Sequence, residues 1–100
     1  MQLTAQDDML VITGNIKTLD DYQAIRDAAT RILAAGGHTL NLRIVDSFSM
    51  PSAVIGFFVK LVQREKVRLS MEIGDSRLLE LLDELCLTGL FKARQGRVGR

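Results

Sequence analysis

The sequence contains few of the residues that build metal centres and catalytic sites. Its 100 residues include one cysteine, one histidine, one proline and no tryptophan. The single Cys86 cannot form an internal disulfide, and no group of His, Cys, Asp and Glu side chains has the spacing of a metal site. No apolar run approaches the length of a membrane span or of a signal-peptide core. We therefore expect a reduced, cytoplasmic protein without a metal or other cofactor.

An excess of charge of one sign is also lacking. The chain has 13 basic and 12 acidic residues, a formal net charge of +1, and no basic stripe with interleaved aromatic residues. We therefore expect no binding to nucleic acid or to a membrane. One hundred residues are enough for one core, which we place in a single domain over residues 1–92. Basic residues gather after Phe91, at Lys92, Arg94, Arg97 and Arg100, and residues 93–100 are expected to form a frayed tail.

The remaining nucleophiles and bases give little support to an enzyme. His38 is expected where a strand begins, far from any obvious partner. Ser47, Ser49 and Ser52 lack the Gly-x-Ser-x-Gly frame of a nucleophile elbow, and a single histidine leaves few ways to activate them. A deep pocket that joined His38 to serines or acids would favour a catalytic site. Without one, we expect a binding protein and not an enzyme.

Hydrophobic periodicity predicts an alternation of strands and helices. A hairpin is expected at 3–13, followed by helices near 18–35, 51–65 and 75–85 and by strands at 38–44 and 67–73. Thr18 and Asp21 have the spacing of a capping box at the start of the first helix. Leu19 in the first helix and Leu85 in the third are expected on the buried faces.

The two inner strands indicate how the helices pack. Residues 38–44 and 67–73 alternate apolar with polar side chains, which is typical of strands with one buried face and one solvated face. We therefore predict an α/β fold with a mixed sheet of four to five strands that begins with a hairpin. The helices are expected mainly on one face, and the other face is expected to be partly solvated.

The stretch 46–56 combines hydroxyl groups with the start of a hydrophobic helix. Pro51 suits the first turn of a helix, and Ser49 or Met50 would then be the cap. Ser52 follows in that first turn, where free N–H groups and the helix dipole favour a negative charge. The stretch is therefore a candidate site for a phosphate on a serine.

A spacing of 100° per residue places one face of this helix outward. The expected outward residues are Ser52, Gly56, Val59, Lys60 and Gln63. A glycine inside a helix costs roughly 1 kcal/mol relative to alanine. Gly56 has two explanations of equal weight, namely room for an approaching partner or close packing against a neighbouring element.

Three segments in this order resemble the STAS domain, the family of bacterial anti-sigma factor antagonists. The first segment is Ile-Thr-Gly-Asn-Ile at 12–16, which is similar to Leu-Thr-Gly-Glu-Leu in that family. The second is Phe-Ser-Met-Pro-Ser-Ala-Val at 48–54, similar to Phe-Met-Asp-Ser-Ser-Gly-Leu. The third is Thr-Gly-Leu-Phe-Lys at 88–92, similar to Ser-Gly-Leu-Phe-Lys. The resemblance covers roughly residues 2–92, nearly the whole expected domain. It implies a STAS-like fold.

The resemblance also implies a function, partner switching. In the family, the unphosphorylated protein binds an anti-sigma factor that is also a serine kinase, and phosphorylation of a serine at the start of the second helix breaks the complex. The aligned serine is Ser52, with Ser49 as the second candidate. The implied partner is an anti-sigma factor or a serine kinase-like switch protein. The expected binding surface comprises Asn15, Lys17, Met50, Pro51, Ser52, Ala53, Gly56, Val59 and Lys60.

The chain departs from the family within this expected surface. Met50 and Ala53 stand where the family has aspartate and glycine, and Asn15 and Lys17 stand where acidic residues are common. Acidic residues at an interface contribute to recognition by a complementary partner. A second interpretation therefore stays open, in which a STAS-like adaptor module binds a signalling or transport partner constitutively, without phosphoregulation.

Overall fold

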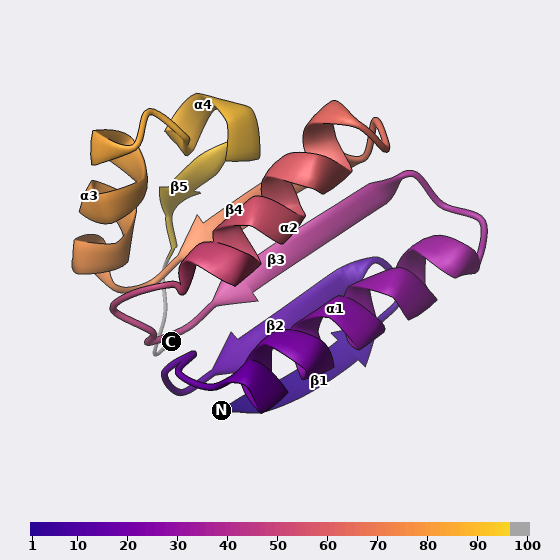
Figure 1. Cartoon of the computed structure of the whole chain (residues 1–100), viewed down its shortest axis with the longest axis horizontal. Helices are drawn as coiled ribbons and strands as arrows, with labels where there is room; N and C mark the ends of the chain where they lie inside the picture. Colours follow the sequence, from indigo (N-terminus) through magenta and orange to yellow (C-terminus); the bar gives the residue numbers. More distant parts are fainter. Residues whose placement is uncertain (97–100) are drawn as a thin grey trace.

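Five strands form one mixed sheet in the order β1-β2-β3-β4-β5 in a computed structural model that describes residues 1–96 (Figure 1). The strands are β1 (Gln2–Gln6), β2 (Met9–Thr13), β3 (Thr39–Ile44), β4 (Arg68–Ile73) and β5 (Ala93–Gln95). The first two pair antiparallel as a hairpin, and β2, β3, β4 and β5 pair parallel with their neighbours. The predicted mixed sheet and its opening hairpin are confirmed.

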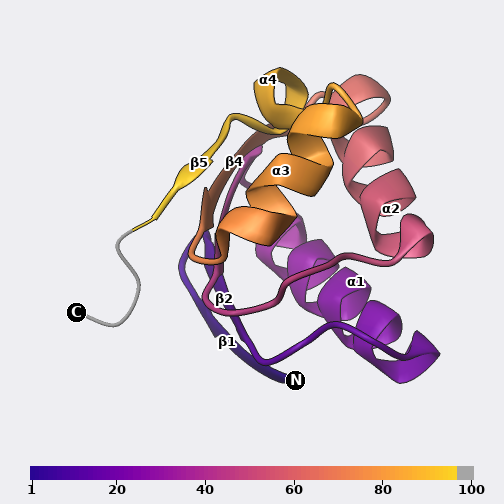
Figure 2. The same cartoon turned by 90° about the vertical axis from the view of Figure 1, so that its left-hand side faces the viewer.

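Four helices connect the strands and cover one face of the sheet (Figure 2). They are α1 (Leu19–Ala34), α2 (Ser52–Gln63), α3 (Ser76–Glu84) and the short α4 (Thr88–Phe91). Within residues 1–96 the opposite face of the sheet carries no helix, as the alternation in β3 and β4 predicts. No helix within residues 1–96 is long and apolar enough to cross a membrane.

The core lies between the sheet and the four helices. The inward side chains of β3 are Leu40, Leu42 and Ile44, each fully or almost fully buried. Phe58 of α2 and Phe91 of α4 meet above them in an edge-to-face contact with ring centroids 6.3 Å apart. Burial of one large apolar side chain contributes about 1.5–3 kcal/mol, so this layer holds the helices at fixed positions on the sheet.

Two helix starts are capped by side chains, and the first of these caps is the predicted capping box. The Asp21 N–H donates to Thr18 Oγ1 at 3.1 Å, and the Thr18 N–H donates to Asp21 Oδ2 at 3.1 Å, which completes the capping box of α1. Asp75 is the N-cap of α3 and accepts a hydrogen bond from the Arg77 N–H at 2.8 Å. Each cap contributes about 1 kcal/mol to stability.

The expected cap of α2 is wrong. Pro51 itself is the N-cap, with φ −60° and ψ 150°, and the helix begins at Ser52. Neither Ser49 nor Met50 caps it, because Pro51 is itself extended and the first helical residue is therefore Ser52. The Met50 side chain instead lies in the core, with 5% of its surface exposed.

Two leucines that periodicity assigned to buried faces lie at the surface. Leu19 is 66% exposed and Leu85 is 48% exposed. Leu19 is the first residue of α1, and Leu85 is the C-cap residue that follows α3. The helical period continues to these helix ends, whereas the buried face does not.

The expected boundary at residue 93 is also wrong. Residues 93–95 form β5, which pairs parallel with β4, and the Gly96 N–H donates to the Ile73 carbonyl at 2.7 Å. Strand pairing therefore extends the domain beyond residue 92. Arg97 and Arg100, which belong to the predicted basic tail, lie outside the described residues.

Candidate functional site

Three loops meet at the edge of the sheet where the parallel strands end. They follow β2 (residues 14–18), β3 (residues 45–51) and β4 (residues 74–75), and each leads into a helix (Figure 1). In parallel α/β sheets this edge commonly carries the binding site, because loops and helix N-termini converge there. The start of α2 therefore lies beside the starts of α1 and α3.

Hydrogen bonds join the first two of these loops into what we term the loop latch. The backbone N–H groups of one loop donate to side chains of the other, in the pairs Gly14 N–H to Asp46 Oδ1 (2.7 Å), Ile16 N–H to Ser47 Oγ (3.3 Å) and Phe48 N–H to Asn15 Oδ1 (3.3 Å). Ser47 is fully buried and also donates to the Ser49 carbonyl at 2.8 Å. The loop latch fixes the backbone that leads to α2.

The start of α2 differs because no side chain caps it. The Pro51 side chain offers no acceptor, and no acidic residue lies in the first turn. The first N–H groups that find an acceptor are those of Val54 and Ile55, which both donate to the Pro51 carbonyl. Within residues 1–96 the N–H groups of Ser52 and Ala53 have no acceptor, and both side chains are exposed. Here a hydroxyl lies beside unpaired donors at the positive end of a helix.

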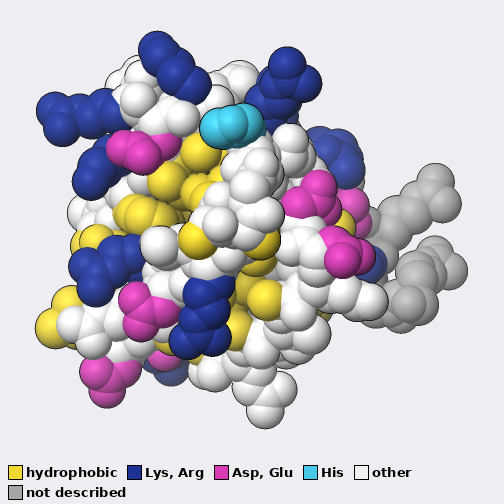
Figure 3. Space-filling view, turned by 90° about the vertical axis from the view of Figure 1, so that its right-hand side faces the viewer, with side chains coloured by type: hydrophobic (Ala, Val, Ile, Leu, Met, Phe, Trp, Pro, Cys, Tyr) yellow, Lys and Arg dark blue, Asp and Glu magenta, His cyan; other side chains and the backbone are white. Residues whose placement is uncertain are grey.

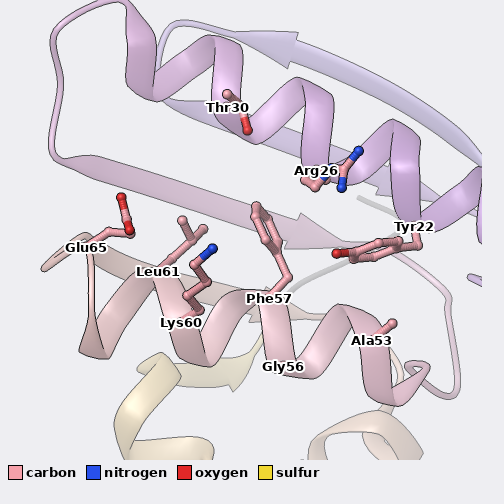
Figure 4. A pocket seen from close by; sticks show the side chains of 9 residues that line it. All are labelled: Tyr22, Arg26, Thr30, Ala53, Gly56, Phe57, Lys60, Leu61 and Glu65. Carbon is pink, nitrogen blue, oxygen red and sulfur yellow. The ribbon is translucent and has the colours of Figure 1, made fainter.

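A groove between α1 and α2 continues from this helix start (Figure 4). This α1–α2 groove has a volume of about 530 Å³ and is lined by Tyr22, Arg26, Thr30, Ala53, Gly56, Phe57, Lys60, Leu61 and Glu65. Its apolar lining comes from Leu61 and from Tyr22 and Phe57, whose rings meet edge to face with centroids 6.4 Å apart. Figure 3 shows the side of the molecule where α1 and α2 end, and hydrophobic surface is visible there between charged side chains.

The charged residues of the α1–α2 groove are mostly basic. The Arg26 guanidinium lies 5.6 Å from the centre of the Tyr22 ring. Lys60 points into the space between the helices and has no ion pair among residues 1–96 (Figure 4). Glu65, at the end of the groove near the C-terminus of α2, supplies the one acidic group in its lining. The groove therefore combines apolar surface with an unpaired cation.

The surroundings of Gly56 decide between its two explanations. A Cβ atom at Gly56 would have no atom within 4 Å outside its own helix backbone. The explanation by close packing is therefore wrong. The position is exposed, and it has open space on the side of the α1–α2 groove.

The structure brings together part of the expected binding surface. Ser52, Ala53, Gly56 and Lys60 are exposed along one side of α2. Met50 does not belong to this accessible surface, because it is buried in the core.

The other expected residues differ in their accessibility. Val59 is half-buried and packs on the core, so its predicted outward placement is wrong; helical spacing did not take account of the neighbouring elements. Pro51 is half-buried at the N-cap, and Asn15 is half-buried with its side chain engaged in the loop latch. Lys17 is exposed, and its N–H donates to Asp21 Oδ2 at 2.9 Å.

Two residues that the sequence did not single out lie beside the loop latch. Phe48 is 43% exposed, and the Arg77 guanidinium carbon lies 5.0 Å from the centre of its ring. Arg77 in turn contacts Asp75, with Nη2 and Oδ2 2.7 Å apart, and this hydrogen-bonded pair lowers the pKa of the Asp75 carboxyl. The sequence signal that could have identified this place is Phe48, an aromatic residue within a polar loop. Aromatic and arginine side chains are enriched at protein interfaces.

The residues considered for catalysis do not converge. His38 precedes β3, and the three serines follow its end, so a strand of six residues, about 20 Å long, separates them. The hollow around His38 is lined by Thr39, Glu65, Lys66 and Arg68, and it contains no serine.

No protein-family model, curated protein or solved structure matches the chain.

Proposed function

We propose that this chain is a STAS-like regulatory protein that binds a protein partner through the start of α2. The proposed partner is a cytoplasmic anti-sigma factor or a serine kinase-like switch protein, and phosphorylation of Ser52 controls its binding. One observation carries the proposal: Ser52 is exposed at a helix start that has no side-chain cap and no acidic residue in its first turn.

The chemistry of a phosphate at Ser52 suits such a switch. A phosphate adds about −1.5 to −2 charges, which the helix dipole and the unpaired N–H groups of Ser52 and Ala53 stabilise in the free protein. In a complex, the same charge would lose water without gaining an equivalent partner. The modification therefore weakens the complex and leaves the fold intact.

The α1–α2 groove extends the proposed contact area beyond the phosphate position. Phe57 and Leu61 provide apolar surface, and Lys60 provides a cation for an acidic group of the partner. At Gly56 the absence of a side chain lets a partner backbone come close to α2. Partner binding is thus expected to depend on both the helix start and the groove.

Binding measurements on Ser52 variants test the switch. Purified wild type, Ser52→Ala and Ser52→Asp are titrated against candidate anti-sigma factors and switch kinases by calorimetry. Ser52→Ala should bind like wild type, whereas Ser52→Asp should bind at least about tenfold more weakly, which corresponds to about 1.4 kcal/mol. Ser49→Asp tests the second candidate at the half-buried position. Equal binding of all four proteins would refute the phosphoswitch and leave the interaction standing.

Gly56→Ala separates the groove from the fold. Because the new Cβ meets open space, the free energy of unfolding should rise by about 0.5–1 kcal/mol in urea titrations. If the partner backbone approaches α2 at this position, the same substitution should weaken partner binding. A more stable variant with unchanged affinity would show that the bare backbone is not used.

The second candidate function is a STAS-like adaptor that binds its partner constitutively. Burial of Met50 favours it, because the side chain before Pro51 is then part of the core and offers no charge for a kinase to recognise. Intact mass measured after incubation with cell extract and ATP distinguishes the two. A phosphate on Ser52 supports the switch, and an unmodified chain that still binds its partner supports the adaptor.

A further inference from the structure

The free edge of β1 lacks the features that usually prevent strand pairing. β1 is an outer strand whose one neighbour is β2, and its register with β2 runs through five residues without a bulge. Its sequence, Gln-Leu-Thr-Ala-Gln, contains no charge and no proline. Natural edge strands are normally protected by lysine, proline, bulges or a covering element. The outer N–H and C=O groups of β1 are therefore available to another strand.

A hollow of about 470 Å³ accompanies this edge on the helical face of the sheet. It is lined by Leu3 and Ala5 of β1 and by Ala24, Asp27, Ala28 and Arg31 of α1. The alanines allow close approach of another helix. Asp27 and Arg31 lie one helical turn apart and carry opposite charges. Within residues 1–96 the one ion pair of Asp27 is an exposed contact of 4.0 Å with Arg26.

We propose that the β1 edge binds a second copy of this chain and forms a two-fold symmetric dimer. A two-fold axis normal to the sheet at Thr4 pairs β1 antiparallel with its copy, so that all five residues of the strand are matched. Leu3 of each chain then lies opposite Ala5 of the other, a large side chain beside a small one. The two sheets join into one, with the helices on the same face.

The charges of α1 explain why a second copy fits this edge. The two-fold axis sets the α1 helices antiparallel across the joined strands, and Asp27 of each chain faces Arg31 of the other. The surface is therefore complementary to itself, as a two-fold interface requires, and each ion pair occurs twice. A surface with charges of one sign would not have this property.

The proposed dimer leaves the α2 start free. The residues of α1 that face the α1–α2 groove are Tyr22, Arg26 and Thr30, on a different side of the helix from Asp27 and Arg31. A dimer thus carries two separate grooves and two exposed Ser52 hydroxyls. This inference does not depend on the proposed function, although two sites in one particle would increase avidity for a multimeric partner.

Sedimentation equilibrium of the full chain tests the proposal. Wild type should approach about twice the 11.1 kDa of one chain as its concentration rises. Thr4→Lys places two ammonium groups beside each other at the axis and charges the edge, and dimerisation should weaken more than about tenfold. Thr4 is exposed, so the variant should keep its fold by circular dichroism. Gln63→Lys, at an exposed position at the end of α2, is the matched control and should still dimerise.

A charge exchange on α1 tests the geometry. Asp27→Arg alone and Arg31→Asp alone each place like charges opposite each other twice, and each should weaken dimerisation by about tenfold. The double variant Asp27→Arg with Arg31→Asp restores both pairs and should recover dimerisation near the wild-type level. A wild-type chain that stays monomeric, a Thr4→Lys variant that dimerises like the control, or a double variant as weak as the single ones would overturn the proposal.

Discussion

The starts of α1 and α2 lie at the same edge of the sheet, but side chains cap only the start of α1. At α1, the Asp21 carboxylate accepts the N–H groups of Lys17 and Thr18, and Thr18 accepts the N–H of Asp21. At α2, Pro51 provides no side-chain acceptor, and the first turn holds no acid. The difference shows that capping is available in this fold and is omitted where the exposed serine lies.

This omission has a definite energetic cost. A side-chain cap contributes about 1 kcal/mol, and proteins of marginal stability commonly give up such amounts at functional positions. α3 follows the pattern of α1, because Asp75 caps it and accepts two further hydrogen bonds from the Arg77 side chain. The open start of α2 is therefore the exception among three neighbouring helix starts, which directs attention to Ser52.

The largest expected effect comes from the residue that holds the two starts together. Ser47→Ala removes the buried hydroxyl of the loop latch and leaves the Ile16 N–H and the Ser49 carbonyl without this partner. The free energy of unfolding should fall by about 2 kcal/mol, since an unsatisfied buried group costs about 1–3 kcal/mol. Urea titration measures it. Ser49→Ala is the control, because the Ser49 hydroxyl makes no hydrogen bond within residues 1–96, and its effect should stay within about 0.5 kcal/mol.

The next prediction compares the two helix starts directly. Thr18→Ala removes the side-chain cap of α1 and should lower stability by about 1 kcal/mol in thermal or urea unfolding. Ser52→Ala removes an exposed hydroxyl that caps nothing, and its effect should stay within about 0.5 kcal/mol. Equal losses for the two variants would mean that Ser52 supports the fold, and the contrast between the two helix starts would disappear.

Local patterns in the sequence predict the α1 start well. The capping box involves Thr18 and Asp21, three residues apart, and the strands show their alternation within six residues. The outward direction of Ser52 and of Gly56 follows from helical geometry. These features depend on short-range sterics and hydrogen bonding, which the local sequence determines.

The features that the sequence did not predict depend on distant contacts. β5 forms because residues 93–95 pair with β4, although their composition suggests a tail. The loop latch joins residues more than thirty positions apart, as in the bond from Gly14 to Asp46. Burial of Met50 likewise results from packing that no local period reveals. The candidate site was therefore predictable as a position on α2, while its support and its accessible residues were not.

The smallest expected effect is a difference in how the two starts respond to acid. Hydrogen bonds from the backbone N–H groups of Lys17 and Thr18 lower the pKa of Asp21 below its ordinary value of 3.8. A depressed pKa in the folded state stabilises the protein above the unfolded pKa, and this contribution disappears as the pH falls through the folded pKa. Asp21→Asn should therefore lower stability near neutral pH, and the difference from wild type should shrink below about pH 3.8.

NMR titration of the Asp21 carboxyl and urea unfolding at several pH values measure this effect. The start of α2 has no acid in its first turn, so Ser52→Ala should show no such change with pH. A carboxyl at Ser52→Asp would lie at the same kind of helix start, and the dipole should lower its pKa as well. That variant would then be more stable above its pKa even as it loses its partner, since one negative charge stabilises the helix start and disfavours the complex. Loss of both stability and binding would instead indicate a damaged fold.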